Sequence, residues 1–506
     1  MNHWIVLPIV LPAVIAPLIV LAMRHDIVLA RVFSLASALA LLALAIGLLV
    51  SASGQPPQVY ALGDWPAPFG IVIVLDRLSA LMLLLTALLG VIVLLHAIGG
   101  WDTRGKHFHA LFQFQLMGIN GAFLTGDFFN LFVFFEVLLI ASYGLMVHGG
   151  GAGRVKAGVQ YVVVNLVGST LFLLAVGLIY AVTGTLNMAD LALKVPQVAA
   201  ADRALLHAGA LLLLVVFAIK AALVPLHFWL PGTYAGAPGP VAALFAIMTK
   251  VGAYAIIRLY SLAFGADAGD AAWLAAPWLQ PAALATLALG FVGVLAARTL
   301  GDLAGFAVIA SMGTLLAAVA LFTPEAMGAA LFYLVHSTFA GAALFLVADL
   351  IAAHRHQYGD QLAPAPRFAR QTLLAGLFFA AAIAVTGMPP LSGFLGKLLI
   401  LDAMRPAPQA VLLWSVILTG SLIAIVAFGR AGSTLFWKST AQPGHIHGTT
   451  GPVLPFVAAG LMLALPVLLT IFAGPAASYF DATAQQLFRP TEYIDAVIGL
   501  RSGAPS

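Results

Sequence analysis

The feature that most constrains this chain is a series of about fourteen apolar stretches, each long enough to cross a lipid bilayer. Only 8% of its residues are charged, too few to cover a water-soluble body of 506 residues. A soluble enzyme, a nucleic-acid binder and a disordered scaffold are therefore excluded, and we expect an all-α polytopic membrane protein. The predicted spans are 4–22, 32–50, 71–97, 107–125, 127–147, 157–182, 205–230, 238–258, 272–297, 302–322, 327–352, 371–402, 408–436 and 452–474.

The rest of the composition narrows the chemistry. No polar stretch is long enough for a soluble domain, so residues 1–506 are expected to form one integral membrane domain. The first span has no basic segment before it, so we do not expect a cleaved signal peptide. The chain has no cysteine, which excludes disulfides, iron–sulfur clusters and Cys-ligated zinc. We expect no cofactor and no bound metal.

Lysine and arginine in the loops predict the orientation in the membrane. The loops after odd-numbered spans carry most of them: Arg24, Arg31, Arg104, Lys106, Arg154, Lys156, Arg298, Arg355, Arg367, Arg370, Arg430 and Lys438. The opposite side carries fewer: Arg77, Lys194, Arg203, Arg258, Arg405, Arg489 and Arg501. The bias places the odd-numbered loops in the cytoplasm and both termini outside.

Four charged residues lie well inside predicted spans, away from the loops and the span ends, namely Glu136, Lys220, Lys250 and Lys397. A charge at the bilayer centre costs about 2.5–3.5 kcal/mol on insertion scales, so these residues require an explanation. The structural explanation is that the lysines reach the headgroups or that a Lys–Glu pair ties two helices together. The functional explanation is a proton pathway, because a lysine desolvated beside a movable counter-charge can switch between holding and releasing a proton.

Two of these lysines lie beside prolines that interrupt their spans. Lys220 is followed by Pro225, and Lys397 is preceded by Pro389 and Pro390. Both breaks contain the frame Pro-Leu-x-x-x-Leu, and they fall in the seventh and twelfth spans. Because that offset is odd, the two copies run in opposite directions, as in transporters built from inverted repeats. An ordinary proline kink is the alternative for either helix.

Histidines and amides offer further polar groups within the spans. His336 lies deep in the eleventh span and His227 just after the first break, and each is a candidate proton relay or a packing residue. Three His-x-His pairs in the loops fit solvated histidines better than a metal site. Other residues that could line a hydrated path are Gln113, Gln115, Asn120 and Thr249.

Three motifs, taken in order, resemble the proton-antiporter family. This family includes the antiporter-like membrane subunits of respiratory complex I and the large subunits of Mrp-type multisubunit Na⁺/H⁺ antiporters. The residue sequence of the first motif and the length of the chain are most similar to those of the D subunits of the Mrp (Mnh, Pha) systems. The motifs are DFFNLFVFFEVLL at 127–139, Lys220 with Pro225 and Trp229-Leu230-Pro231, and TKVGAY at 249–254 with Arg258.

The resemblance implies fourteen helices with two inverted five-helix repeats and broken helices 7 and 12. It divides the chain into N-terminal helices (about 4–97), two repeats (107–258 and 272–436), and a last helix with an amphipathic tail (452–506). It also implies that Glu136 and Lys220 form a charge pair, that Lys250 relays protons, and that Lys397 serves the second half. Many relatives have a lysine where this sequence has Gly341, so the link between halves must use His336, Lys250 and water.

The expected function is that of a proton-translocating subunit in a multisubunit Na⁺ or K⁺/H⁺ antiporter of the bacterial inner membrane. The expected partners are other subunits of that complex. One alternative is a proton-pumping membrane subunit of complex I or of a membrane-bound hydrogenase, and another is a passive assembly subunit. Residues 476–498 form either an amphipathic surface helix interrupted at Pro490 or a tail docked on another subunit.

Overall fold

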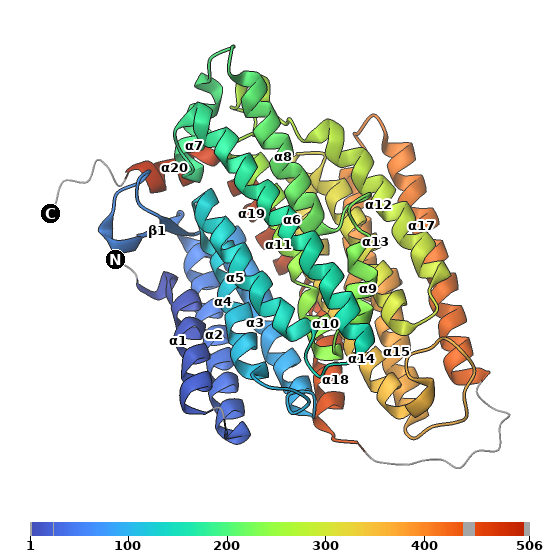
Figure 1. Ribbon diagram of the computed structural model, residues 1–506. Helices are drawn as coiled ribbons and strands as arrows, with labels where there is room; N and C mark the ends of the chain where they lie inside the picture. Colours follow the sequence, from blue (N-terminus) through green and yellow to red (C-terminus); the bar gives the residue numbers. More distant parts are fainter. Residues whose placement is uncertain (1–2, 24, 439–450, 500–506) are drawn as a thin grey trace.

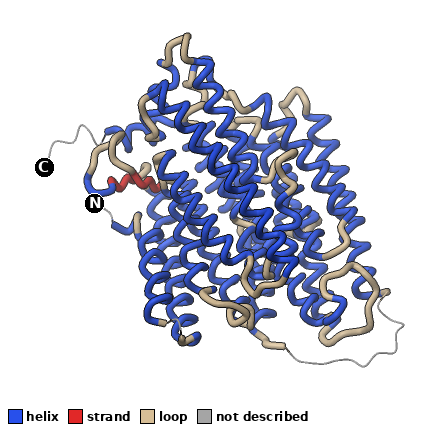
Figure 2. The backbone as a smooth tube through the Cα atoms, in the orientation of Figure 1, coloured by secondary structure: helices blue, strands red, loops and turns tan. Residues whose placement is uncertain are grey.

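The computed structural model describes residues 3–23, 25–438 and 451–499. Every one of the fourteen predicted spans contains a helix or a pair of helices, arranged as a single bundle (Figures 1 and 2). Among the described residues, eleven helices are long and apolar enough to cross a membrane. The first half comprises α1 (Leu7–Ala22), α2 (Ile27–Gly54), α3 (Arg77–Ile98), α4 (Phe108–Leu124), α5 (Phe128–Met146), α6 (Ala152–Thr183), α8 (Arg203–Ala221), α9 (Trp229–Gly236), α10 (Gly239–Phe245) and α11 (Met248–Leu262).

The second half continues the same pattern. Its helices are α12 (Ala276–Ala296), α13 (Leu300–Val319), α14 (Pro324–His354), α15 (Gln371–Thr386), α16 (Ser392–Ala403), α17 (Ala410–Gly432) and α18 (Leu454–Ile471). Short helical turns cover His3–Ile5, Leu62–Asp64, Val195–Gln197, Gly269–Ala271, His356–Tyr358 and Ser433–Trp437, and α7 covers Met188–Lys194. The predicted breaks in spans 7 and 12 are confirmed by the gaps between α8 and α9 and between α15 and α16. The relation of the two halves as inverted repeats stays a prediction.

Burial separates the inner helices from the outer ones. Every residue is buried in the most apolar stretches of α10–α11 and α14, whereas only 33% are buried in those of α2, α17 and α18. The exposed surface is apolar, with Val163, Leu166, Leu418 and Leu422 more than half exposed. Apolar side chains that face outward all around a bundle are suited to lipid rather than water. The chain is a multi-pass membrane protein.

One part of the fold departs from an all-helical arrangement. Strands β1 (Gln58–Ala61) and β2 (Val72–Leu75) form an antiparallel hairpin in which Gln58 pairs with Leu75. The prediction that the third span begins at residue 71 was therefore wrong, since its helix begins at Arg77. The cause is the short run Val72–Leu75, because four apolar residues fit a buried strand as well as a helix.

The C-terminal tail folds back across its own bundle. After α18, helix α19 (Ala473–Leu487) packs on α14, and α20 (Pro490–Ile498) lies beside α7 and β1 (Figure 1). The predicted interruption at Pro490 is confirmed, and the large buried side chains of the tail are those of Phe480, Leu487, Tyr493 and Val497. Docking on another subunit is thus not needed to bury the apolar face of the tail.

Beneath the tail lies a buried ion pair that the sequence did not indicate. Arg258 donates to Asp76 at 2.7 Å, and both side chains are almost fully buried. The guanidinium also lies 5.2 Å from the centre of the Tyr493 ring. The position of Arg258 near the end of a span suggested a loop residue that marks topology. The structure shows that it belongs to the buried interior instead. Two other predicted markers, Arg24 and Arg501, lie outside the described residues.

This pair makes a stability prediction. Asp76→Asn should lower the free energy of unfolding by about 3–5 kcal/mol, because it leaves Arg258 as a buried charge without a counter-ion. Thermal unfolding of the purified protein in detergent measures the loss. The matched control is Asp402→Asn, which breaks an exposed pair with Arg405 and should cost at most about 1 kcal/mol. Equal losses in the two variants would mean that the buried pair has no special role.

Candidate functional site

Glu136 and Lys220 meet on one face of α6. Ser169 donates a hydrogen bond to the carboxylate of Glu136, and the Nζ of Lys220 donates to the Oδ1 of Asn165 at 3.0 Å. Asn165 and Ser169 are four residues apart, so they lie on consecutive turns of the same helix. Among the described residues, no direct ion pair joins Glu136 to Lys220, although the two lie within electrostatic range. The expected charge pair is thus bridged by α6.

The first break places Lys220 at the end of α8. The helix stops at Ala221, and the backbone N–H of Val224 donates to the hydroxyl of Thr286 on α12 at 2.9 Å. The Nε1 of Trp229 donates to the carbonyl of Ile219, which ties α9 back to α8. His227 is half-buried within the break, and no described hydrogen bond links it to Lys220. The structure does not bring this histidine into the site.

Lys250 is fully buried, and its Nζ has no hydrogen-bond partner within the described structure. It lies two residues after α11 begins, because the eighth span is interrupted between Phe245 and Met248. This third break had not been predicted. A Cβ atom at Gly252 would come within 3.1 Å of the Cβ of Lys220, so α11 and α8 are packed almost backbone to backbone here. The two lysines therefore lie on directly adjoining helices.

His336 connects α14 to both sides of the second break. Its Nε2 lies 3.1 Å from the carbonyl oxygen of Ala384, the third residue from the end of α15, and its Nδ1 lies 2.8 Å from the hydroxyl of Ser392, the first residue of α16. A carbonyl only accepts, so Nε2 carries the hydrogen and Nδ1 accepts from Ser392 when the ring is neutral. His336 also lies within electrostatic range of Lys250 and Lys397.

Lys397 closes the series in the second half. Its Nζ donates to the carbonyl of Thr386 at 2.7 Å, across the break, and to the hydroxyl of Ser421 on α17 at 2.8 Å. Pro389 and Pro390 form the turn between these elements. The backbone of Gly387 leaves room for the lysine, since a Cβ atom there would lie 2.9–3.1 Å from its side-chain atoms. Lys220 and Lys397 thus each lie on one arm of a broken helix, and each donates to a polar group of a neighbouring element.

Comparisons with known proteins identify the family to which the chain belongs. The model of the family described as "NADH:quinone oxidoreductase/Mrp antiporter, TM" matches residues 125–424. The chain belongs to this family. It is 41% identical to the D subunit of a probable K⁺/H⁺ antiporter of Rhizobium meliloti over 98% of both chains. It is 37% identical to the D subunit of the Na⁺/H⁺ antiporter of Bacillus subtilis, over 98% of this chain and all of that one.

A solved structure agrees with the sequence relatives. The chain is similar to one in the Mrp complex from Dietzia sp. DQ12-45-1b, with a TM-score of 0.86 and 29% identity over 99% of this chain and 100% of that one. The resemblance inferred from the three motifs is therefore confirmed. The predicted all-α polytopic membrane fold is confirmed as well.

In this chain there is free space beside Gly341, next to His336. A Cβ atom at Gly341 would contact only Val308, at 3.5 Å. Gly341 lines a small cavity with His336, Tyr333 and Ser337, and the cavity has room for about one water molecule. The expected route through His336 and water thus has a place for that water.

Several other predicted residues prove to be packing groups. The amide of Gln113 bonds to Ser34 and Ser37 of α2, and that of Asn120 donates to the carbonyl of Pro8. These two side chains hold α1 and α2 and do not line a path between the lysines. Gln115 differs, because it donates to the Sδ of Met248 beside the break in the eighth span and its Oε1 has no described partner. Thr249 bonds to the carbonyl of Ala246.

The loop histidines do not assemble a metal site within the described residues. His109 contacts Asp102 at 3.1 Å, His354 bonds to the carbonyl of Leu350, and the pair at His445 and His447 lies outside the described residues. Burial raises the pKa of Asp102, but bonds from His109 and Arg31 outweigh it and hold that pKa at about 2. Asp102 therefore stays ionised and ties α2 to the start of α4.

Sequence reasoning missed Asn165, Ser169 and Ser421, the side chains that hold Glu136, Lys220 and Lys397. A signal was present, because Asn165 and Ser169 are polar residues one turn apart inside a predicted span. Uncharged polar residues inside spans can thus hold the charged groups, as these do, or only pack helices together, as Gln113 and Asn120 do.

Proposed function

We propose that this chain is the D subunit of a multisubunit monovalent cation/proton antiporter and that it carries the protons. The observation that supports this most is a series of ionisable groups inside the spans: the half-buried Glu136, then the buried Lys220, Lys250, His336 and Lys397. These groups run through both halves of a fold shared with an Mrp complex subunit. The relatives named as antiporter subunits extend over almost the whole chain.

Protonation in this series is coupled by charge. A negative Glu136 stabilises a positive Lys220, and binding of a proton by Glu136 removes that stabilisation. The proton that Lys220 gives up can be taken by the unpartnered amine of Lys250, which lies on the adjoining helix. His336 then passes a proton by accepting at one ring nitrogen and releasing from the other. Lys397 completes the route beside the second break.

The proposed setting is a bacterial inner membrane, with the chain assembled among the other subunits of the complex. Loops after odd-numbered spans face the cytoplasm, and both termini lie outside, as the distribution of basic residues predicts. Protons move inward while Na⁺ or K⁺ leaves. A reporter that is active only outside the cytoplasm should therefore be active when it is fused after Ser506. A cytoplasmic signal from that fusion would reverse the proposed orientation.

The deciding experiment is an assay of everted membrane vesicles that contain the whole complex. A dye that is quenched by the acidic interior should recover fluorescence when Na⁺ or K⁺ is added, because the antiporter releases protons in exchange. Vesicles without this chain should not respond. The family description also names NADH:quinone oxidoreductase. A complex that lacks the cation response, moves protons on NADH oxidation and co-purifies with flavin and iron–sulfur subunits would favour that alternative.

The Gly387 position gives a test of the second half. Gly387→Ala should lower cation-dependent proton release several-fold, because φ is +75° and the new methyl group would displace Lys397 from Thr386 and Ser421. The left-handed backbone itself costs about 1–2 kcal/mol. Gly376→Ala is the matched control, since Gly376 lies in α15 with open space around it. If Gly387→Ala and wild-type complexes give equal vesicle responses at equal amounts, Lys397 takes no part in the proton route.

A further inference from the structure

A cavity of about 480 Å³ lies where α1, α2 and α4 meet, at the end of the bundle opposite the tail (Figure 1). Two loops line it, the one between α1 and α2 and the one that leads into α4, together with the helix ends beside them. Its apolar wall includes Ile19, Met23 and Ala30, which belong to a small cluster separate from the main core. The residues of the proposed proton route do not line this cavity.

The polar end of the cavity is the N-terminus of α4. The backbone N–H groups of Phe108, His109 and Ala110 have no acceptor among the described residues, and His107 before them provides no side-chain cap. The N-terminus of α2 differs, because the carboxylate of Asp26 caps it. Free N–H groups at a helix N-terminus, together with the helix dipole, favour the binding of an anion.

The side chain of His109 supplies a second polar group without a partner. It is 2% exposed and lines the cavity, and its Nε2 lies 3.1 Å from the carboxylate of Asp102. An ionised carboxylate only accepts, so Nε2 carries the hydrogen and Nδ1 is an acceptor when the ring is neutral. Nδ1 is buried and has no described partner. A hydroxyl group of a ligand in the cavity would supply the missing donor.

The charges around the cavity favour an anion over a cation. Among the described residues that line it, only Asp102 is acidic. Its carboxylate already accepts from Arg31, at 2.6 and 2.9 Å, and from His109. Lys106 and His107 also line the cavity and are exposed. Because the one negative charge is neutralised, the remaining basic groups attract anions.

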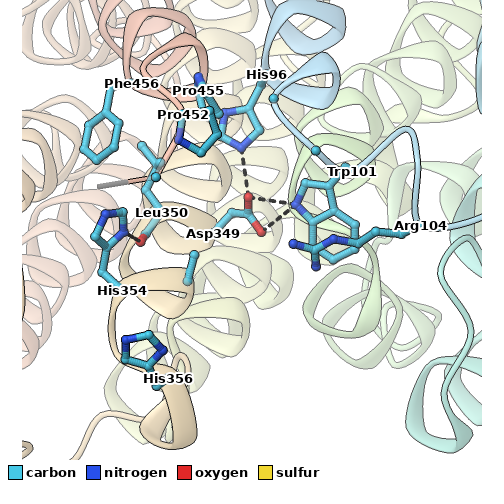
Figure 3. A pocket seen from close by; sticks show the side chains of 14 residues that line it. His96, Trp101, Arg104, Asp349, Leu350, His354, His356, Pro452, Pro455 and Phe456 are labelled. Atoms are coloured by element: carbon cyan, nitrogen blue, oxygen red, sulfur yellow. Dashed lines mark hydrogen bonds and ion pairs between the residues drawn. The ribbon is translucent and has the colours of Figure 1, made fainter. Parts of the chain in front are cut away.

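The loop that leads into α4 is held in place from its other side (Figure 3). The carboxylate of Asp349 on α14 accepts from the Nε1 of Trp101 at 2.9 and 3.0 Å, and it lies 2.8 Å from the Nε2 of His96. Arg104 lies over the Trp101 ring, 3.9 Å from its centre. These contacts fix the loop, so the N-terminus of α4 and Lys106 are positioned before a ligand binds.

The surface next to the cavity is apolar. On α1 and α2, the side chains of Leu21, Val28 and Val32 are each more than half exposed. A ligand with an anionic, hydroxyl-bearing head and hydrocarbon chains fits this combination of surfaces. Phosphatidylglycerol has this chemistry, and basic pockets between membrane helices bind anionic headgroups.

We propose that this cavity binds the headgroup of an anionic glycerophospholipid of the phosphatidylglycerol type. The phosphate lies at the N-terminus of α4 and beside Lys106, and a headgroup hydroxyl donates to the Nδ1 of His109. The acyl chains lie along the outer surface of α1 and α2. The inference does not rest on the proposed proton route, so lipid binding alone tests it.

The test is native mass spectrometry of the purified whole complex in micelles that contain phosphatidylcholine and phosphatidylglycerol. The wild-type complex should retain phosphatidylglycerol in preference. Lys106→Gln should weaken the binding of one such lipid about fivefold, the change expected for one basic residue near an anionic surface. Lys106 is exposed, so this variant should assemble. His109→Phe should also weaken retention, because it keeps the ring and removes its nitrogen atoms, while Asp102 keeps its bonds from Arg31.

The matched control is Lys156→Gln, which removes an exposed lysine near the same end of the bundle and should leave retention unchanged. A wild-type complex without preference for phosphatidylglycerol, or a Lys106→Gln complex that retains as much as wild type, would overturn the proposal. Displacement of the lipid by inorganic phosphate would show a site for a soluble anion instead. Loss of a co-purified subunit from Lys106→Gln, with lipid unchanged, would assign the cavity to an acidic segment of that subunit and contradict lipid binding.

Discussion

Glu136→Gln is expected to abolish cation-dependent proton release while the complex still assembles. Glutamine has the size of glutamate and can still bond to Ser169, so the packing of α5 against α6 is preserved. It cannot carry the negative charge that stabilises a positive Lys220, and the coupling between the two groups is lost. We expect the rate in everted vesicles to fall at least about tenfold, which is the change that about 1.4 kcal/mol produces.

The control for this variant is a change that keeps the charge. Glu136→Asp shortens the side chain by one methylene and weakens the contact with Ser169, so it should retain part of the activity. Ser169→Ala removes the hydroxyl and leaves the carboxylate, and it should slow transport less than Glu136→Gln. If Glu136→Gln and wild-type complexes are equally active at equal amounts, the carboxylate has no part in the proton route.

Lys250→Met is expected to have two opposite effects. It should abolish proton movement, because it removes the titratable group that the described route places between Lys220 and His336. It should also stabilise the protein by about 1–4 kcal/mol, because the Nζ of Lys250 is fully buried without a described hydrogen-bond partner and methionine fills nearly the same volume. Thermal unfolding of the purified complex and the vesicle assay measure the two effects.

A residue kept for function at a cost in stability shows this combination of results. The control is Lys156→Met, which changes an exposed lysine and should change stability by less than about 1 kcal/mol. A Lys250→Met complex that is less stable than wild type would show that the amine has bonds that hold the fold. In that case the burial of Lys250 would be no argument for its role in proton transfer.

The helices could be predicted from sequence because each apolar stretch long enough to span a bilayer has few alternatives. The same reasoning found Glu136, Lys220, Lys250 and Lys397, since a charge is conspicuous in an apolar span. Strand β2 (Val72–Leu75) was missed because a four-residue apolar run fits a strand or a helix end equally well.

Pairings between distant helices could not be predicted, because one sequence does not state which faces meet. Arg258 was predicted to be a topology marker and proved to form a buried pair with Asp76. His96 and Asp349 are likewise distant in sequence, and neither stood out within its own span. The bridging of Glu136 and Lys220 through α6 depends on how three helices pack, which no single helical pattern contains.

The most direct test of a proton route through this chain uses the purified whole complex in proteoliposomes that enclose a pH-sensitive dye. A Na⁺ or K⁺ gradient across the liposome membrane supplies the driving force, and the rate of internal pH change is the readout. Complexes with the wild-type chain should change the internal pH as soon as the gradient is imposed. Complexes with Lys250→Met should give only the leak of liposomes without protein. Equal rates from equal amounts of the two complexes would contradict proton transfer through Lys250.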